Sequence, residues 1–356
     1  MFRLQLRYDT IPKSENATML ISTFPIMRIV SWYYISGFLI FYLLMKILAA
    51  LGGNAILKSR EKGTEAEQLE NLRFTSDQLV QLVQAGHQIA ITHGNGPQVG
   101  DIFLLYELAK DTIPKMPLDV CGAQSQGMLG YLFQQAMDNA LRRSGMAISI
   151  ATIVTQTIVD KNDPAMLNPT KPIGPFYSKK EANHLKMING WQVLKDSNRG
   201  YRRVVASPRP KEIVEAKLIK DLFDRGHIVV NSGGGGIPVI RQDDDTLRGV
   251  EAVIDKDLTA SLMASILGVD VFLIITDVDH VYLNYGTKYQ RALQKLSVVE
   301  CSKYLKQNHF AAGSMAPKIE AVMEFVKRSG KRAIITSLEN VSQALEGNTG
   351  TTITRV

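Results

Sequence analysis

Short, uniformly apolar runs alternate with amphipathic stretches along most of this chain, and that alternation restricts the folds open to it. Residues 46–51 (KILAAL), 88–92 (QIAIT) and 271–276 (VFLIIT) are such runs, of the kind found in strands that are buried on both faces. Between the first two, residues 65–85 carry leucines and valines at helical spacing. The pattern predicts an α/β fold whose mainly parallel sheet is covered by helices on both faces. Ligands of such folds lie at the carboxyl ends of the strands.

The same alternation predicts the remaining elements. Strands are expected at 147–155, 227–231 and 333–336, and helices at 122–144, 208–225, 256–267, 314–329 and after the capping box of Ser297 and Glu300. Residues 160–206 interrupt the pattern with four prolines in twelve positions. We expect this segment to be an inserted, protruding lid subdomain, because long irregular insertions in compact domains are usually functional; plain surface decoration is the alternative.

The N-terminal segment raises a separate question. Residues 29–45 (IVSWYYISGFLIFYLLM) are almost uncharged and have the hydropathy of a membrane span or a signal segment. They run into the predicted first strand at Lys46 without a linker, whereas a helix leaving a bilayer needs several residues to turn. We therefore expect Met45 to be the natural start, residues 1–44 to lie outside the fold and residues 45–356 to form the domain. A membrane-associated protein is the alternative if residues 1–44 are translated.

The composition excludes several classes of protein. Among 356 residues, 41 Lys and Arg against 34 Asp and Glu leave a net charge of +7, and 21% of residues are charged, which is typical of a globular chain and not of a disordered or collagenous one. Cys121 and Cys301 are too few for a disulfide scaffold and match no zinc spacing, so a cytoplasmic protein is expected. The positive charge forms no Lys/Arg block, so no nucleic-acid partner is expected.

Three glycine-rich segments follow predicted strands directly: Gly52-Gly53-Asn54, Gly94-Asn95-Gly96 and 233–236. Glycine lets backbone N–H groups approach an anion closely, and the start of a following helix adds a favourable dipole. Any one of the three could be a tight turn. Because the topology brings all three to one edge of a parallel sheet, they predict a site for phosphate or a small carboxylate-like anion.

Lysines near these loops point to phosphoryl transfer. Lys256 and Asp257 open a predicted helix, Lys318 lies near the start of another, and Lys171 stands among the prolines of the insertion. An isolated lysine is usually a solvated one, but a lysine beside an aspartate at a helix start within an apolar segment needs that partner or an anionic ligand. Phosphoryl transfer needs cations around the transferred group more than covalent chemistry. The P-loop, dinucleotide-binding and protein-kinase signatures do not occur in the sequence.

Eight segments, spread over nearly all of residues 46–356 and including the inserted segment, carry a family resemblance. They are ALGGNAIL (50–57), ITHGNGPQVG (91–100), DKNDPAMLNPTKPIGPFY (160–177), YRRVVASPRP (201–210), NSGGGGIPV (231–239), VIDKDLTASLMA (253–264), TDVDHVYLNYG (276–286) and AAGSMAPKIEA (311–321). Together these segments resemble the carbamate kinases of the amino-acid kinase family. The resemblance implies an αβα sandwich, a homodimer, and reversible, Mg²⁺-dependent phosphoryl transfer between ATP and carbamate. A role in making ATP from carbamoyl phosphate, in arginine or related catabolism, is expected.

Residue roles follow from the same resemblance. Lys256 and Lys318 would stabilise the transferred phosphoryl group, with Asp257 orienting them and assisting the metal ion, and Lys171 would reach the carbamoyl phosphate from the lid. The remaining site residues are expected to hold the nucleotide's terminal phosphate (Gly52, Gly53, Asn54), the substrate (Gly94, Asn95, Gly96, Gly234, Gly235) and the adenine and ribose (Asp277, Tyr282, Met315, Pro317). Many amino-acid kinases carry a lysine just before the first glycine pair, where this chain has Ala50-Leu51.

Three other functions remain open. A kinase of the same fold could phosphorylate an amino-acid carboxylate, a nucleotide or an isoprenoid phosphate, although an acylated amino acid needs a larger pocket with a cation for its α-carboxylate. A non-catalytic anion-binding or membrane-anchored sensor is disfavoured because all four charged residues of the catalytic set are present. A basic nucleic-acid binder is the weakest alternative.

Overall fold

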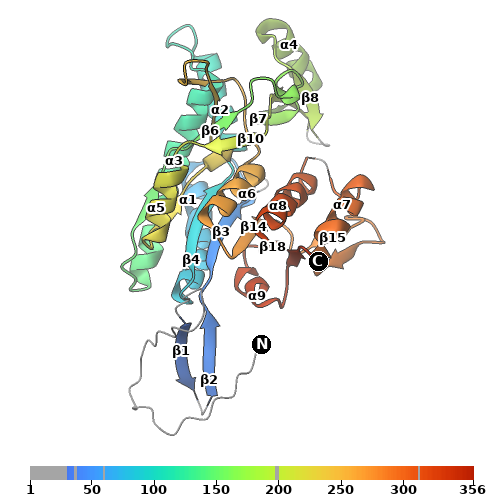
Figure 1. Ribbon diagram of the computed structural model, residues 1–356. Helices are drawn as coiled ribbons and strands as arrows, with labels where there is room; N and C mark the ends of the chain where they lie inside the picture. The colour runs from blue at the N-terminus through green and yellow to red at the C-terminus, as the bar shows by residue number, and fades with distance from the viewer. Residues whose placement is uncertain (1–29, 36–37, 59–60, 197–199, 312) are drawn as a thin grey trace.

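The computed structural model describes residues 30–35, 38–58, 61–196, 200–311 and 313–356, and its centre is an eight-stranded sheet (Figure 1). In spatial order the strands are β17 (Lys295–Ser297), β19 (Thr351–Thr354), β18 (Arg332–Ser337), β14 (Val271–Thr276), β3 (Lys46–Leu51), β4 (Gln88–His93), β11 (Ile228–Val230) and β5 (Ile150–Thr152). All neighbours run parallel except β18 and β19. The expected mainly parallel sheet is confirmed.

Helices cover both faces of this sheet, as the uniformly apolar strands require. In β3, Ile47, Ala49 and Leu51 face one apolar core, while Leu48 and Ala50 face the other. The first core is shared with α1 (Glu65–Gln84), α3 (Leu118–Arg143) and α9 (Val341–Glu346). The second is shared with α5 (Ala216–Asp224), α6 (Lys256–Leu267), α7 (Val298–Lys306) and α8 (Met315–Ser329). The αβα layering that the resemblance implies follows from this alternation.

Three smaller sheets complete the body. One has the order β10 (Pro210–Ile213), β6 (Gln156–Val159), β12 (Ile237–Arg241), β13 (Leu247–Gly249), and another pairs β15 (Val281–Leu283) with β16 (Arg291–Leu293). The third belongs to the predicted insertion and has the order β7 (Lys171–Tyr177), β9 (Gly200–Val205), β8 (Val193–Asp196), with α4 (Lys179–Asn189) beside it. Short 3₁₀ turns occupy Gly53–Ala55, Pro164–Met166 and Gly233–Gly235. We call the segment 160–206 the lid.

The lid packs on α2 (Gly96–Leu108) through a small apolar core of its own. Val99 and Phe103 of α2 meet Ile173, Trp191 and Val205 of the lid there. The backbones touch at one point: a Cβ atom on Gly100 would lie 1.9 Å from the Cα atom of Gly174. Only a pair of glycines permits this approach, so a direct backbone contact between α2 and β7 adds to the side-chain packing.

The described part of the N-terminal segment is a hairpin of β1 (Val30–Ile35) and β2 (Phe38–Leu43). It forms a two-stranded sheet of its own and extends beyond the end of the central sheet in Figure 1. Residues 1–29 and 36–37 lie outside the described residues. Within the described ranges, none of the helices combines the length and the hydropathy that crossing a membrane requires.

Three sequence-based expectations were wrong in detail. The helix expected at 208–225 begins at Ala216, because Pro210–Ile213 pair with β6 as strand β10. The single strand expected at 147–155 is divided: Ile150–Thr152 join the central sheet, and the chain then turns into β6 of the smaller sheet. Helix α2 was not expected, since its first turn lies in the glycine-rich segment GNGPQVG.

Candidate active site

Two adjoining cavities lie at the carboxyl ends of β3, β4 and β14, where a parallel sheet is expected to bind its ligands. The larger, of about 350 Å³, runs from the glycine turn after β3 to the ends of β14 and β18. The smaller, of about 190 Å³, lies between the glycine turn after β4, the start of α6 and the lid. Gly53, Ser314 and Lys318 line both. We call these three residues the shared wall.

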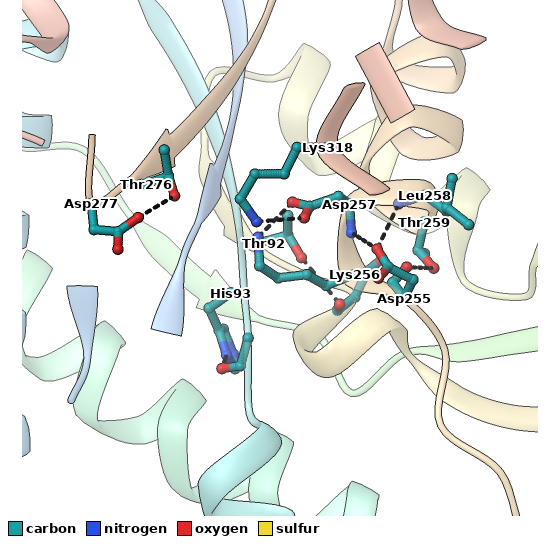
Figure 2. Close-up of polar contacts among 12 residues, drawn as sticks. Thr92, His93, Asp255, Lys256, Asp257, Leu258, Thr259, Thr276, Asp277 and Lys318 are labelled. Carbon is teal, nitrogen blue, oxygen red and sulfur yellow. Dashed lines mark hydrogen bonds and ion pairs between the residues drawn. The ribbon is translucent and has the colours of Figure 1, made fainter. Parts of the chain in front are cut away.

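A buried carboxylate lies between two lysines (Figure 2), one of which, Lys318, belongs to the shared wall. Asp257 receives Lys256 Nζ on Oδ1 at 2.6 Å and Lys318 Nζ on Oδ2 at 3.0 Å. The two lysine side chains are only 12% and 13% exposed, and that of Asp257 is 4% exposed. The cluster therefore places two cations, held by one anion, where the two cavities meet.

The titration of this cluster follows from burial and mutual attraction. Burial opposes ionisation of Asp257, but Lys256 and Lys318 outweigh it and hold the pKa of the carboxyl below its usual range. Burial lowers the pKa of Lys256, against the opposing pull of Asp257. At Lys318 burial is outweighed by Asp257 and its neighbouring carboxylates, so the pKa is raised. Asp257 thus holds charged lysines in a site that would otherwise disfavour them.

The lid reaches the cluster through Asp255, a residue that sequence reasoning missed. Its Oδ1 caps α6 by accepting from the backbone N–H groups of Asp257 at 2.9 Å and Leu258 at 3.4 Å. Its Oδ2 accepts from Lys171 Nζ at 2.6 Å. One carboxylate thus links the lid lysine to the helix that carries Lys256. The signal available in the sequence was an aspartate one residue before a predicted helix, the position of an N-cap.

The glycine turns that follow β3 and β4 line different parts of the site. Gly52, Gly53 and Asn54 line the larger cavity, and Gly94, Asn95, Gly96 and Gly234 line the smaller. Gly235 lines neither: its carbonyl oxygen accepts from Thr157 Oγ1 at 2.9 Å and Thr259 Oγ1 at 3.0 Å, which tie β6 and α6 to the turn. Its observed contacts are those of a structural residue.

The four residues expected at the adenine and ribose are spread more widely. Asp277 lines the larger cavity and accepts from Thr276 Oγ1 at 3.0 Å, while Pro317 lines the smaller one. Met315 packs against the core on the α6 face, and Tyr282 of strand β15 lies beside Tyr285, with ring centroids 5.8 Å apart. Neither Met315 nor Tyr282 is among the residues lining the two cavities.

His93 directly precedes the glycine turn that lines the smaller cavity, and it was also missed. It ends β4, stacks on Phe133 with ring centroids 5.6 Å apart, and its Nδ1 lies 2.9 Å from the carbonyl oxygen of Gly94. Since a carbonyl only accepts, Nδ1 carries the proton. Burial lowers the pKa of His93 to about 4, so at neutral pH the ring is uncharged and adds no cation below Lys256. A histidine directly before a glycine turn was the only sequence signal.

Comparisons with known proteins agree on the family. The sequence profile of the amino acid kinase family matches residues 45–337. A carbamate kinase of Pyrococcus furiosus is 50% identical over 310 residues, which are 86% of this chain and 98% of that protein. A carbamate kinase of Trichomonas vaginalis is 49% identical over 311 residues, 87% of this chain and 99% of the relative.

Solved structures give the same result. The carbamate kinase from Giardia lamblia bound to AMP-PNP superposes with a TM-score of 0.81 at 44% identity, covering 87% of this chain and 98% of that one. The same enzyme bound to citric acid superposes with a TM-score of 0.83 over the same shares of the two chains. The matched region begins at Met45, one residue before the first strand of the central sheet. The chain therefore belongs to the amino acid kinase family and groups with its carbamate kinases.

Proposed function

We propose that this chain catalyses reversible phosphoryl transfer between ATP and carbamate, giving ADP and carbamoyl phosphate. The observation that carries the proposal is the Lys256–Asp257–Lys318 cluster beside the wall shared by two cavities. The carbamate kinases at about 50% identity support the choice of acceptor. The larger cavity would take the nucleotide, with its terminal phosphate at Gly53, and the smaller cavity the carbamoyl group.

The chemistry requires cations rather than a base. A carboxylate oxygen of carbamate attacks the γ-phosphorus of ATP, the bond from that phosphorus to the β-bridging oxygen breaks, and ADP leaves with the electron pair. No proton moves in this step, because the attacking oxygen is already an anion. Lys256 and Lys318 would stabilise the negative charge on the transferred group, and Asp257 would hold both lysines in place before the substrates arrive.

Mg²⁺ would enter with the nucleotide. Both oxygens of Asp257 are taken by lysines, and the described residues contain no cluster of three or more His, Cys, Asp or Glu side chains that could hold a metal ion by themselves. This donor set fits an ion bound mainly through nucleotide phosphates, with Asp257 as the acidic side chain that would assist in holding it. When bound, Mg²⁺ neutralises phosphate charge and so supports the two lysines.

The lid would close the smaller cavity. Lys171 of β7 already lines this cavity and pairs with Asp255. When carbamoyl phosphate arrives, Lys171 can leave Asp255 and bind the oxygens of the ligand instead. Excluding water would protect carbamate and carbamoyl phosphate from hydrolysis. We further propose that residues 45–356 form the catalytic unit, that it works as a homodimer in the cytoplasm, and that it makes ATP in arginine or related catabolism.

A coupled assay tests the proposal directly. Purified protein receives carbamoyl phosphate and ADP, with and without Mg²⁺. The protein is then removed by ultrafiltration, and the ATP formed is measured with hexokinase in excess Mg²⁺. We expect Mg²⁺-dependent ATP formation, and none when an acylated amino-acid phosphate replaces carbamoyl phosphate. ATP formation absent under all conditions, while a known carbamate kinase is active in parallel, would refute the proposed function.

A further inference from the structure

The amide of Asn95 has a fixed orientation, and a chain of two hydrogen bonds fixes it. Ser125 of α3 is fully buried, and its Oγ lies 2.7 Å from the carbonyl oxygen of Gly122 and 2.7 Å from the amide of Asn95. A serine hydroxyl has a single proton, and a carbonyl oxygen can only accept. The proton of Ser125 therefore goes to Gly122, and Ser125 can only accept from Asn95. The Asn95 atom that faces Ser125 must be the NH₂ group.

It follows that the carbonyl oxygen of Asn95, Oδ1, is turned away from Ser125. An asparagine at a helix N-cap commonly uses this oxygen to accept from a backbone N–H of the first turn, but the Asn95 side chain makes no such capping hydrogen bond to α2. Within the described part of the chain, no group donates to Oδ1. Asn95 lines the smaller cavity, so a free acceptor belongs to that cavity.

The plane of the amide is fixed as well. Gly234 lies flat against it: a Cβ atom on Gly234 would come within 2.2 Å of Cγ, Nδ2 and Oδ1 alike. Gly234 has φ +65°, a conformation that favours glycine. The turn after β11 thus packs on one face of the amide while Ser125 holds one edge, and the oxygen edge has no freedom to turn.

A fixed acceptor is unexpected in a cavity built for anions. Lys171, Lys256 and Lys318 line the same space and would attract the oxygens of a carbamoyl phosphate. An oxygen acceptor repels those atoms and attracts an N–H. The carbamoyl group has one: its amino group, which distinguishes it from acetyl and other acyl groups of similar size.

We propose, resting on the proposed function, that Oδ1 of Asn95 accepts a hydrogen bond from the amino group of the carbamoyl substrate and makes the site reject acyl phosphates that lack an N–H. Asn95 is then a specificity residue, and Ser125 a positioning residue that acts through it. An acetyl group would leave Oδ1 without a partner in a site closed to water, and an unpaired buried acceptor is costly.

The test compares two acyl phosphates that differ by NH₂ against CH₃. For wild type, Asn95→Ala and Ser125→Ala, kcat/KM is measured with ADP and either carbamoyl phosphate or acetyl phosphate; where acetyl phosphate turnover is too slow to measure, its inhibition constant against carbamoyl phosphate replaces it. Asn95→Ala should lower kcat/KM for carbamoyl phosphate about 10- to 100-fold and leave kcat/KM for acetyl phosphate within about threefold. The selectivity, which is the first kcat/KM divided by the second, should therefore fall.

Ser125→Ala should also lower the selectivity, because the freed amide of Asn95 can turn its NH₂ edge to the cavity. The loss should be smaller than in Asn95→Ala, because the amide oxygen is still present. Ser265→Ala is the matched control: Ser265 also donates to a carbonyl of its own helix, Ser261 at 2.9 Å, and it lines neither cavity. It should leave the selectivity unchanged. Circular dichroism and melting curves establish that each variant is folded.

Two outcomes would overturn the inference. Equal losses for both acyl phosphates in Asn95→Ala would mean that Asn95 serves the phosphate or the packing of the turn. Unchanged selectivity in Asn95→Ala and Ser125→Ala, both folded, would mean that another group reads the amino group. Failure of the proposed function looks different, since wild type itself would then form no ATP from carbamoyl phosphate.

Discussion

Asp257 determines the electrostatics of the site. Two lysines side by side repel each other, and burial further disfavours their charge; a carboxylate that binds both, at 2.6 and 3.0 Å, removes the first penalty and reduces the second. The free energy needed to bring the two cations together is supplied when the protein folds, before any substrate binds. In the proposed reaction, the transferred phosphoryl group would therefore meet charges that need no reorganisation.

Replacing Lys256 by alanine should remove most activity and leave the fold intact. Loss of one preorganised electrostatic donor lowers turnover by about 10²- to 10³-fold. Turnover is measured at saturating carbamoyl phosphate and ADP, with a melting curve for stability. Lys331→Ala is the control, because Lys331 is also ion-paired, with Asp270 at 3.1 Å, but lines neither cavity. Turnover above about a tenth of wild type would make Lys256 structural.

His93 gives the stability of the protein a pH dependence of known sign. Its pKa of about 4 in the fold lies below the usual value of 6.5, so the unfolded chain binds the proton first as the pH falls. The contribution of the neutral ring is fully present above pH 6.5 and is lost progressively toward pH 4. Between pH 7 and pH 5 the loss is about 2 kcal/mol.

Urea unfolding of wild type and His93→Gln at pH 7 and pH 5 measures this contribution. Glutamine can still donate to the carbonyl oxygen of Gly94 but does not titrate. Wild type should lose about 2 kcal/mol more than the variant over this interval. Equal losses in the two proteins would show that His93 titrates normally and is therefore accessible to water in solution.

At the scale of elements, the contact between α2 and β7 positions Lys171. Gly100→Ala would place a Cβ 1.9 Å from the Cα atom of Gly174, so β7 must move. We expect stability to fall by about 1–3 kcal/mol and kcat/KM for carbamoyl phosphate to fall at least about tenfold, as for Lys171→Ala, because the loss of one charged partner of a ligand costs that much. ADP affinity, measured by calorimetry, should change little, since the larger cavity does not include the lid.

Gly127→Ala is the control for that substitution. Gly127 lies inside α3, and its added Cβ would meet nothing within 4 Å. The fold should gain up to about 1 kcal/mol, because alanine restricts the unfolded chain and favours helix. If Gly100→Ala behaves like Gly127→Ala in both stability and kinetics, the lid does not depend on the close approach.

Some elements could be predicted from the sequence and others could not, depending on whether local signals determine them. Strands β3 and β14 and helix α6 occur at the predicted residues because periodicity and capping are local signals. Helix α2 was missed because the glycines that open it suggest a phosphate turn, and β10 was taken for helix because its pairing with β6 is a tertiary contact. The lysines could be proposed from a motif, but Asp255, Ser125 and His93 depend on partners distant in the sequence.

At the scale of the whole molecule, we expect the central sheet to be stable without the residues before Met45. Removal of residues 1–44 should leave the melting temperature within about 2 °C and turnover within about twofold, because β3 obtains its neighbours from β4 and β14 while the hairpin of β1 and β2 pairs with itself. Calorimetry and the coupled assay compare the two chains. A large loss of stability would place the hairpin within the folding unit.

The shared wall of Gly53, Ser314 and Lys318 has a kinetic consequence. The proposed function gives each substrate a cavity of its own, and among the described residues only these three line both cavities. The phosphoryl group could therefore pass directly from one bound partner to the other. The enzyme need not store it on a side chain between two half-reactions. Double-reciprocal plots of initial rates at several fixed ADP concentrations should therefore intersect, as for a ternary complex, whereas parallel lines would reveal a phosphorylated enzyme. Both substrates can therefore be bound at the same time, and no product has to leave before the second substrate binds.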